Sequence, residues 1–340
     1  MRTKITRIHD FPAVAAADLG NRILSYELPK NYVYVSLILQ AVAVVTTTVV
    51  APTRSEDAQH RMAERYTLTR DGGTPVNVAA RPFGLFAEEL HGVADDIQET
   101  APLVIGANTL EHLVEIPLCD PTVPFASPQY VESLLVGFRR TALEFKIQVP
   151  LNVEQMYTAA GGTVVLTSLN YHLFARILTD YTQKDVQSLL KLNREMRYIT
   201  KREVLPAATG FEYGVYRDEH LDRDVRPLKI GHLLMDDKVR DPDLLEECTV
   251  KIGGDFYQPE NFDADCLKAI DVWRGKFDQV DGFYITDLDG VHDHASAPFA
   301  SRGADFQLWR TILAAGPVAA GSYDVVQMSI GDAEYKDKKV

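Results

Sequence analysis

Hydrophobic and polar residues alternate over short segments along much of the chain, and clusters of turn residues separate these segments. Residues 3–50, 66–78, 101–118 and 142–169 are rich in β-branched and aromatic residues, which favour strands over helices. Asp71-Gly72-Gly73 divides one of these segments, and an Asp-Gly pair is typical of a tight hairpin turn. Many short strands with frequent turns predict an all-β sandwich rather than a parallel sheet.

Two further segments have helical spacing. Residues 83–92 predict one short helix, and apolar residues recur at helical intervals within residues 183–196, at Val186, Leu189 and Met196. The second of these segments has no clear counterpart near the end of the chain. We therefore interpret it as a connection between two domains.

The two halves of the chain carry the same signals in the same order, although they share no long identical run. The matching pairs of segments are 11–15 with 205–208, 66–73 with 249–254, 83–90 with 264–273, 112–117 with 282–286, 142–149 with 304–311, and 161–167 with 321–327. Such a repeat predicts two copies of one β-rich domain. A duplicated β-domain without an evident active site indicates a structural role rather than catalysis.

The repeat predicts a domain organisation. We expect a first domain at residues 1–180, a helical connection at residues 181–198, and a second domain at residues 199–340 that ends in a polar tail. Each half carries one short helix among its strands. The predicted fold class is all-β, with two tandem jelly-roll sandwiches (a double jelly roll) and a few short helices.

Residues 31–53 carry no charged side chain, and the segment is long enough for a membrane-spanning helix. Its β-branched and aromatic residues favour a pleated structure instead, and its Ser, Gln and Thr residues weaken membrane insertion. We therefore predict two strands, at residues 32–39 and 41–50. A membrane-anchored protein that uses this segment is the weaker alternative. No signal peptide is apparent, because no apolar region with a cleavage site follows the basic start closely.

Composition narrows the classes of function. The chain has 340 residues, of which 46% are hydrophobic and 24% charged, as in a globular protein with room for two cores. A net charge of −13 disfavours general nucleic-acid binding, which needs a basic surface, and it keeps a free subunit soluble. The cysteines, Cys119, Cys248 and Cys266, are widely spaced and form no metal-ligand pattern, which fits a reducing compartment.

The order of these signals resembles the major coat proteins of membrane-containing icosahedral bacteriophages of the corticovirus type, which belong to the double-jelly-roll lineage. The likeness spans nearly the whole chain. The pieces that carry it are the opening at residues 3–14, the Gly turn at 71–73, the restart at 199–204, and the closing segments 283–287, 305–308 and 323–327.

The resemblance implies a capsid protein without catalytic activity. Such proteins form homotrimers of pseudo-hexagonal outline, which tile an icosahedral shell around an internal membrane. The implied partners are further copies of the chain and the vertex (penton) and membrane proteins of the virion, and the implied location is the virion, with the host cytoplasm before assembly. The basic start, with Arg2, Lys4 and Arg7, is suited to peripheral contact with anionic lipid or an internal scaffold protein, and an ordinary solvated terminus is the alternative.

One motif resembles a catalytic site. A predicted strand runs into Asp287-Leu-Asp289-Gly290-Val291, which is similar to the first motif of haloacid-dehalogenase phosphatases. Only residues 292–340 follow, too few for the doubly wound sheet of that fold. A turn between two strands is therefore the better interpretation.

The same loop contains the candidate metal ligands of the chain, Asp287, Asp289, His292, Asp293 and His294. Its oxygens suit Ca²⁺ and its imidazoles suit a transition metal, so the set is chemically mixed, and a solvated acidic loop is favoured. A carbohydrate-binding or cupin-like metal enzyme on tandem jelly rolls would use this His292-Asp293-His294 segment and is the alternative function. Another acidic cluster, at residues 235–243, lacks EF-hand spacing and predicts a surface loop, with interfacial Ca²⁺ as a further possibility. We expect no cofactor.

Overall fold

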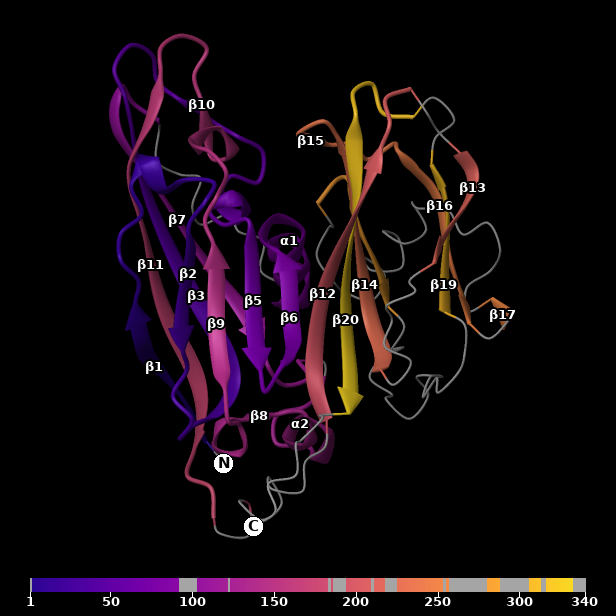
Figure 1. Cartoon of the computed structure of the whole chain (residues 1–340). Coiled ribbons are helices and arrows are strands. Elements are labelled where there is room, and N and C mark those ends of the chain that lie inside the picture. Colours follow the sequence, from indigo (N-terminus) through magenta and orange to yellow (C-terminus); the bar gives the residue numbers. More distant parts are fainter. Residues whose placement is uncertain are drawn as a thin grey trace. The chain divides into compact units, whose positions relative to one another are not determined.

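The computed structural model describes residues 2–91, 103–121, 123–182, 185, 194–208, 211–217, 225–252, 255–256, 280–287, 306–312 and 316–332. The chain divides into two compact units, the first built mainly of Met1–Leu90 and Asp95–Tyr198 and the second mainly of Ile199–Gly331. Each unit is described by itself. Figure 1 shows two layers of strands in each.

The first unit contains two packed sheets. One has the strand order β1-β11-β3-β7, with β8 also paired to β3, and the other has the order β2-β9-β5-β6. The strands and α-helices of this unit are β1 (Arg2–Asp10), β2 (Ile23–Glu27), β3 (Val33–Thr47), β4 (Thr53–Arg54), β5 (Arg65–Arg70), β6 (Gly73–Ala79), α1 (Ala80–His91), β7 (Gly106–Pro117), α2 (Pro128–Glu132), β8 (Leu135–Val136), β9 (Leu143–Gln148), β10 (Tyr157–Thr158) and β11 (Val164–Thr179). Its short 3-10 helices are η1 (Ala16–Asp18), η2 (Gln59–Arg61), η3 (Gly137–Arg139) and η4 (Val153–Gln155).

Strand alternation builds the core of the first unit. On β3, the inward side chains are Leu37, Leu39, Ala41, Ala43 and Val45, and each is at most 2% exposed. The inward side chains of the other sheet include Tyr66, Leu68, Phe145 and Ile147, which are equally buried. Burial of each large apolar side chain contributes about 1.5–3 kcal/mol, so this interior is the main source of stability.

The charge-free segment forms one long strand, and the prediction of two separate strands at residues 32–39 and 41–50 is wrong. Strand β3 runs without a break for 15 residues. Gln40, where we placed the break, points outward and donates a hydrogen bond to Glu111 of β7. The strand therefore passes a polar residue without leaving the sheet. Among the described residues, no helix is long and apolar enough to cross a membrane.

The second unit repeats the two-sheet arrangement. One sheet has β12, β20 and β14 in that order, with β18 and β15 both paired to β14, and the other has the order β13-β19-β16-β17. The strands are β12 (Arg194–Leu205), β13 (Phe211–Arg217), β14 (Val225–Asp236), β15 (Val239–Arg240), β16 (Leu245–Ile252), β17 (Asp255–Phe256), β18 (Phe283–Asp287), β19 (Phe306–Ile312) and β20 (Gly321–Asp332).

Strand pairing confirms the internal repeat. The order β1-β11-β3-β7 in the first unit corresponds to β12-β20-β14-β18 in the second, and β2-β9-β5-β6 corresponds to β13-β19-β16-β17. Corresponding strands also follow one another in the same order along the chain. The segment pairs noted in the sequence fall on β5 and β16, β7 and β18, β9 and β19, and β11 and β20. This order of strands, with two sheets built in Greek-key fashion, is that of a jelly roll.

The observed helices agree less closely with the sequence predictions than the strands do. The helix expected at residues 83–92 is confirmed as α1, whereas α2 was not expected, although Ser127-Pro128 is a standard start signal. The predicted helical connection reached Met196 within residues 181–198, but β12 already begins at Arg194. Residues 194–198 are therefore strand, because β-branched and aromatic residues just beyond them carry the strand onward. Residues 186–193 lie outside the described part of the chain.

A close backbone approach makes Gly137 a sensitive position. A Cβ there would lie 2.7 Å from the carbonyl oxygen of Tyr32 and 3.1 Å from that of Lys30, and neither backbone atom can move freely. We expect Gly137→Ala to lower the free energy of unfolding by about 1–3 kcal/mol, measured by urea denaturation. Gly73→Ala is the control, because its nearest atoms would lie 3.6 Å away, and it should change stability by no more than about 0.5 kcal/mol. Equal stability of the two variants would show that the backbone around Gly137 accommodates a side chain without cost.

Candidate assembly surface

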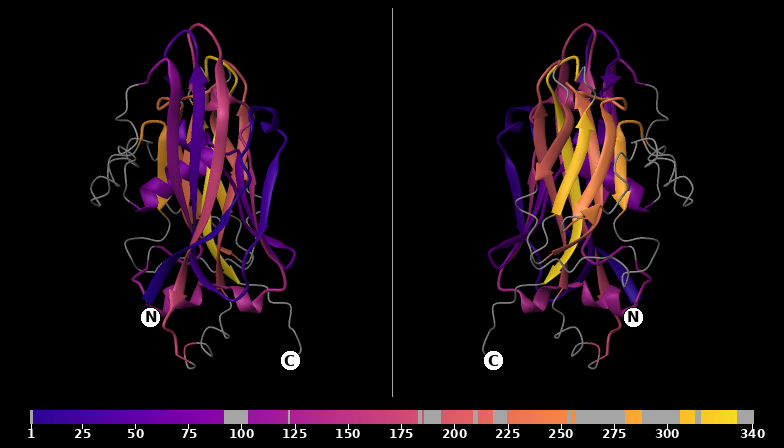
Figure 2. Two further views of the ribbon diagram at one scale, coloured as in Figure 1. Left: turned by 90° about the vertical axis from the view of Figure 1, so that its left-hand side faces the viewer. Right: turned by 90° about the vertical axis from the view of Figure 1, so that its right-hand side faces the viewer.

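The outward side of the β1-β11-β3-β7 sheet is an exposed face with an uncharged centre, called the outer face below. Alternation along β3 turns every second residue outward, and no charged residue occurs among them. These outward residues of β3 are Ser36, Ile38, Gln40, Val42, Val44 and Thr46. Neighbouring side chains cover Ser36 and Ile38, whereas the other four are partly exposed. Figure 2 (left) shows the long strands of this sheet side by side.

Apolar side chains continue across the outer face to the neighbouring strands. Phe174 of β11 lies opposite Ile38, and Leu113 of β7 lies opposite Gln40. Leu113 is 56% exposed, and Ile5 of β1 is 55% exposed. Leu113 and Ile5 lie on strands at opposite edges of this sheet, with Ile38 and Phe174 between them. An apolar surface that extends across a sheet is typical of a face that contacts other chains.

Charged residues of the outer face occur on its flanking strands and are paired. Arg7 and His172 both bond the carboxylate of Asp10, with 2.7 Å between His172 Nδ1 and Asp10 Oδ1. The hydrogen bonds from His172 and Arg7 hold the pKa of Asp10 below its usual value. On the opposite flank, Glu115 accepts from Ser36 and from Arg176. These pairs neutralise each other, so the face presents little net charge.

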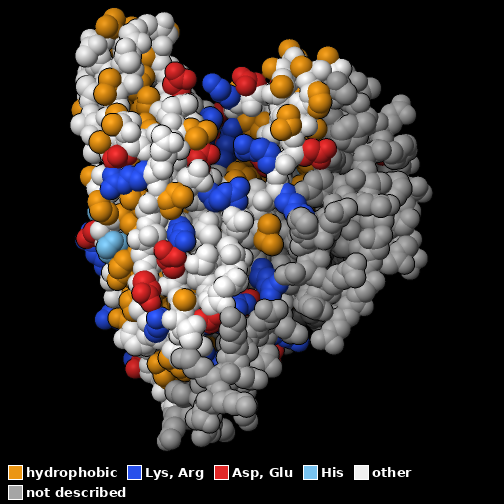
Figure 3. Space-filling model, in the orientation of Figure 1, with side chains coloured by type: hydrophobic (Ala, Val, Ile, Leu, Met, Phe, Trp, Pro, Cys, Tyr) orange, Lys and Arg blue, Asp and Glu red, His pale blue; other side chains and the backbone are white. Residues whose placement is uncertain are grey.

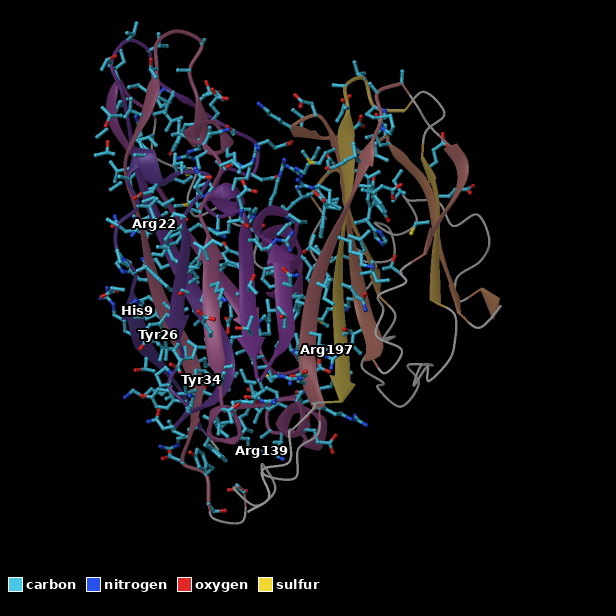
Figure 4. All side chains as sticks on the ribbon, viewed as in Figure 1. His9, Arg22, Tyr26, Tyr34, Arg139 and Arg197 are labelled. Atoms are coloured by element: carbon cyan, nitrogen blue, oxygen red, sulfur yellow. The ribbon has the colours of Figure 1, made fainter. Side chains whose placement is uncertain are left out.

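Stacked rings fix one corner of the first unit. His9, near the end of β1, stacks on Tyr26 of β2, with ring centroids 4.0 Å apart and an interplanar angle of 11°. Figure 4 shows the two side chains lying together. The contact links the two sheets of the unit where β1 leaves the edge of its own sheet.

A buried group of charged side chains lies within the first unit, which includes the beginning of β12 as far as Tyr198. Arg70 of β5 donates two hydrogen bonds to the carboxylate of Glu195, and Arg140 Nη2 lies 3.6 Å from Glu195 Oε2. The side chains of Arg70, Arg140 and Glu195 are each at most 5% exposed. Arg197, labelled in Figure 4, also donates to Glu195. A buried carboxylate with several guanidinium partners costs little, whereas one without them is strongly destabilising.

Asp71 connects this charged group to the hairpin turn that the sequence predicted. Its side chain accepts hydrogen bonds from the backbone N–H groups of Thr141 and Ala142, and it lies 3.6 Å from Arg140. Burial raises the pKa of Asp71, but the bonds from Thr141 and Ala142 outweigh it, and the pKa is lowered overall. Asp71 has a φ of 46° and Gly72 a φ of 93°, as a tight hairpin turn requires. The Asp-Gly hairpin is therefore confirmed.

A pair of histidines is buried in the first unit. His60 Nδ1 lies 3.3 Å from His112 Nε2, and His60 Nε2 lies 3.0 Å from Glu88 Oε1. Gly84 of α1 makes room for His60, because a Cβ there would lie 2.2 Å from its ring. The sequence carried one signal of this pair, since His112 occupies an inward position of β7 between Leu110 and Val114.

A single histidine takes a similar place in the second unit. His232 of β14 is fully buried, with its ring nitrogens 2.7 Å from Tyr323 Oη and 3.0 Å from Thr286 Oγ1. Cys248 Sγ lies 3.9 Å from His232 Nε2. Both ring nitrogens therefore have neutral polar partners, as in a histidine of a structural core.

The described residues do not form a metal site or a reactive thiol. No group of at least three His, Cys, Asp or Glu side chains in the described part of the chain could hold a metal ion. Burial raises the pKa of the Cys119 thiol to about 12, so it stays protonated and unreactive. In the acidic cluster at residues 235–243, both carboxylate oxygens of Asp236 accept from backbone N–H groups, those of Val318 and Ala319. Interfacial Ca²⁺ remains a prediction.

The candidate metal loop falls almost entirely outside the described residues. Asp287 is the last residue of β18, while Asp289, His292, Asp293 and His294 lie beyond the described range. Metal binding by this loop therefore stays a prediction.

The phosphatase-like motif has a different structural context from the one its chemistry needs. Strand β18, which ends at Asp287, runs antiparallel to β14. The doubly wound fold would place such a strand in a mostly parallel sheet. This supports a turn at Asp287 rather than a phosphatase nucleophile.

Comparison with known proteins finds the same fold in viral capsids. The chain matches no protein-family model and no curated protein. It does match the major capsid protein P2 of bacteriophage PM2, with a TM-score of 0.61 and 13% identity, over 98% of this chain and 99% of that one. It also matches the MCP of STIV, the Sulfolobus turreted icosahedral virus, with a TM-score of 0.69 and 12% identity, over 100% and 99% of the two chains.

A third match is the PBCV-1 virus capsid, with a TM-score of 0.63 and 9% identity, over 98% of this chain and 95% of that one. These matches show that the chain has the double-jelly-roll fold of major capsid proteins. The fold class expected from the sequence is thereby confirmed.

The buried charged group gives a stability prediction. Glu195→Gln removes the negative charge that Arg70 and Arg140 share, and we expect the free energy of unfolding to fall by about 3–5 kcal/mol. Urea denaturation of the purified protein measures this loss. Glu144→Gln is the control, because Glu144 pairs with Lys146 at 2.9 Å on the surface, where such a pair contributes about 0–1 kcal/mol. Similar small losses in both variants would show that the buried group is not important for stability.

Proposed function

We propose that the chain is a major capsid protein that forms pseudo-hexagonal homotrimers, which tile an icosahedral shell over an internal membrane. The observation that carries the proposal is the complete repetition of one jelly roll along the chain, with matching capsid proteins covered end to end. Three chains with two similar rolls each supply six similar edges, and closed threefold symmetry buries apolar surface between copies. The uncharged centre of the outer face supports contact between copies of the chain.

The alternative of a carbohydrate-binding or cupin-like metal enzyme has little support. A cupin holds its metal inside a roll, between the two sheets. Within the described residues no group of three or more His, Cys, Asp or Glu side chains, the buried His60, His112 and Glu88 included, could hold a metal ion, and the matching structures are capsid proteins. We therefore propose a protein without catalytic activity and without a cofactor.

The proposal includes partners, location and domain organisation. The partners are further copies of the chain, together with vertex (penton) and membrane proteins, and nucleic acid is not among them, given the net charge of −13. The location is the virion, and the host cytoplasm before assembly. The first roll comprises residues 1–180, the connection precedes β12 within residues 181–193, and the second roll begins with β12 at Arg194.

Peripheral contact with lipid would involve the beginning of β1. Arg2 pairs with Thr179 at the end of β11, so the basic start lies at the end of the sheet opposite the pair formed by Thr47 of β3 and Val164 of β11. Arg7 is engaged by Asp10 and His172, whereas the side chains of Arg2 and Lys4 are exposed, with Arg2 Nε 3.8 Å from Asp180 Oδ2. This leaves Arg2 and Lys4 as the residues suited to an anionic membrane surface.

The trimer is tested by the mass of the purified protein in solution. Light scattering behind size-exclusion chromatography should give about 114 kDa, three chains of 38.0 kDa in a closed ring. Negative-stain electron microscopy of the same peak should show hexagonal particles. A stable monomer at every concentration would refute the proposed assembly.

The lipid contact is tested by sedimentation with vesicles of phosphatidylglycerol and phosphatidylcholine. Lys4→Ser should weaken binding to the anionic vesicles about fivefold, since one lysine near the surface contributes about 1 kcal/mol. Lys146→Ser removes the same charge from the other sheet and should leave binding unchanged. Equal effects of the two substitutions would show that binding depends on the overall charge of the protein and not on a contact made by Lys4.

A further inference from the structure

One end of the first unit presents a group of exposed apolar side chains, called the tip below. It consists of Val49, Val50, Val104, Ile105 and Val165, which are 39–62% exposed. Strand pairing brings them together, because Thr47 at the end of β3 lies opposite both Val164 of β11 and Gly106 of β7. Figure 3 shows hydrophobic and uncharged side chains at this end of the unit.

The tip is held in a defined shape by its own backbone and side chains. The Asn108 side chain accepts from the N–H of Val104 and donates to the carbonyl oxygens of Val104 and Gly106. On the other side, Val49 packs directly on Gly162, where a Cβ would lie 3.2 Å from Val49 Cβ. A preformed apolar surface loses little conformational entropy when it binds a partner.

The segments that form the tip contain no charged residue. These are residues 31–53, 103–110 and 155–171. Charged residues make up 24% of the whole chain, so their absence from these three segments is a local property. Arg54 is the nearest charged residue along the chain after Val50, and it pairs with Tyr157 of β10.

The second unit shows that the fold itself does not require an uncharged tip. The ends of β14, β20 and β18 correspond to those of β3, β11 and β7, and the turn that follows β14 is strongly charged. The charged residues of this turn are Asp236, Asp237, Lys238, Arg240, Asp241 and Asp243. The two units therefore differ in charge at the same structural position, the end of β3 in one and of β14 in the other. The fold does not require this difference, so we attribute it to what each end contacts.

We infer that the tip of the first unit is a contact surface for further copies of this chain, where tips pack on one another around the threefold axis. This inference rests on the proposed trimer and names the surface that holds it together. Copies with a net charge of −13 repel each other, and an uncharged surface is where they approach without opposing charges. A lipid surface fits less well, because the tip has no basic residue and no aromatic residue for the membrane interface.

The test introduces like charges at the tip. The Val49→Glu/Ile105→Glu variant changes two side chains that are 62% and 59% exposed, so the fold should be retained, as circular dichroism and the melting temperature will show. Sedimentation equilibrium should find that the concentration for half-dissociation of the trimer rises at least tenfold. The uncharged Val49→Thr/Ile105→Thr variant should remain a trimer.

A matched control adds the same charges to the second unit. Val318 and Val239 are 90% and 57% exposed, and the Val318→Glu/Val239→Glu variant should leave the trimer intact. Equal dissociation of both Glu variants, or an intact trimer with the charged tip, would overturn the inference. A wild-type protein that is monomeric throughout would instead refute the proposed trimer, on which the inference rests.

Cross-linking tests the contact without weakening it. Val49→Cys in a Cys266→Ser background places a thiol at the tip, while Cys119 and Cys248 are buried and unavailable. A short bismaleimide should join copies of Val49→Cys within the trimer into covalent dimers, and should leave Val318→Cys uncoupled. Absence of coupling at Val49 in a confirmed trimer would place the tips apart and contradict the inference.

Discussion

The continuous pairing of β3 with β11 on one side and β7 on the other determines the structure of the first unit. A shift of register by one residue would turn Leu37, Leu39 and Ala41 towards solvent and would bring Ile38 and Gln40 into the core. Strand β7 pairs with β3 in one register from Ser36 to Thr47, and β11 pairs with β3 over a similar length with two register shifts, between Leu166 and Ser168 and between Arg176 and Ile177. These two neighbours specify which way each side chain of β3 faces along most of the strand. The same constraint defines which side chains form the core, the outer face and the tip.

Polar and charged side chains in a core need partners, and both units provide them. The first unit buries Glu195 between Arg70 and Arg140, and a histidine pair beside Glu88. The second unit places Tyr323 and Thr286 beside His232, and its buried Asp324 accepts two hydrogen bonds from Arg202. Buried charges tolerate few substitutions, because removal of one partner leaves the other without compensation. The beginning of β12 therefore depends on residues far away in the sequence.

The sequence predicted those features that local chemistry determines. The Asp71-Gly72 hairpin, helix α1 and the order of the repeated strands follow from turn residues and periodicity. The single strand β3 could not be distinguished from two strands, because Gln40 finds its partner, Glu111, on a strand 71 residues away. The bond from Arg70 to Glu195 spans 125 residues and has no local signal. The outer face and the tip are formed by residues of strands that are distant in the sequence. Their composition could not be predicted until the pairing of these strands was known.

Duplication adds an argument that a single domain does not offer. Corresponding strands of the two rolls satisfy the same requirements of pairing and burial, so what they share reflects the fold. Features that differ between the two rolls are not required by strand pairing or burial. We attribute them to the surroundings of each roll. The turn after β3 is uncharged and the turn after β14 is charged, although β3 and β14 occupy the same position in the strand order of their units. In the proposed shell of many copies, the two rolls of one chain would meet different neighbours, and a difference in surface chemistry between the rolls is what such an assembly requires.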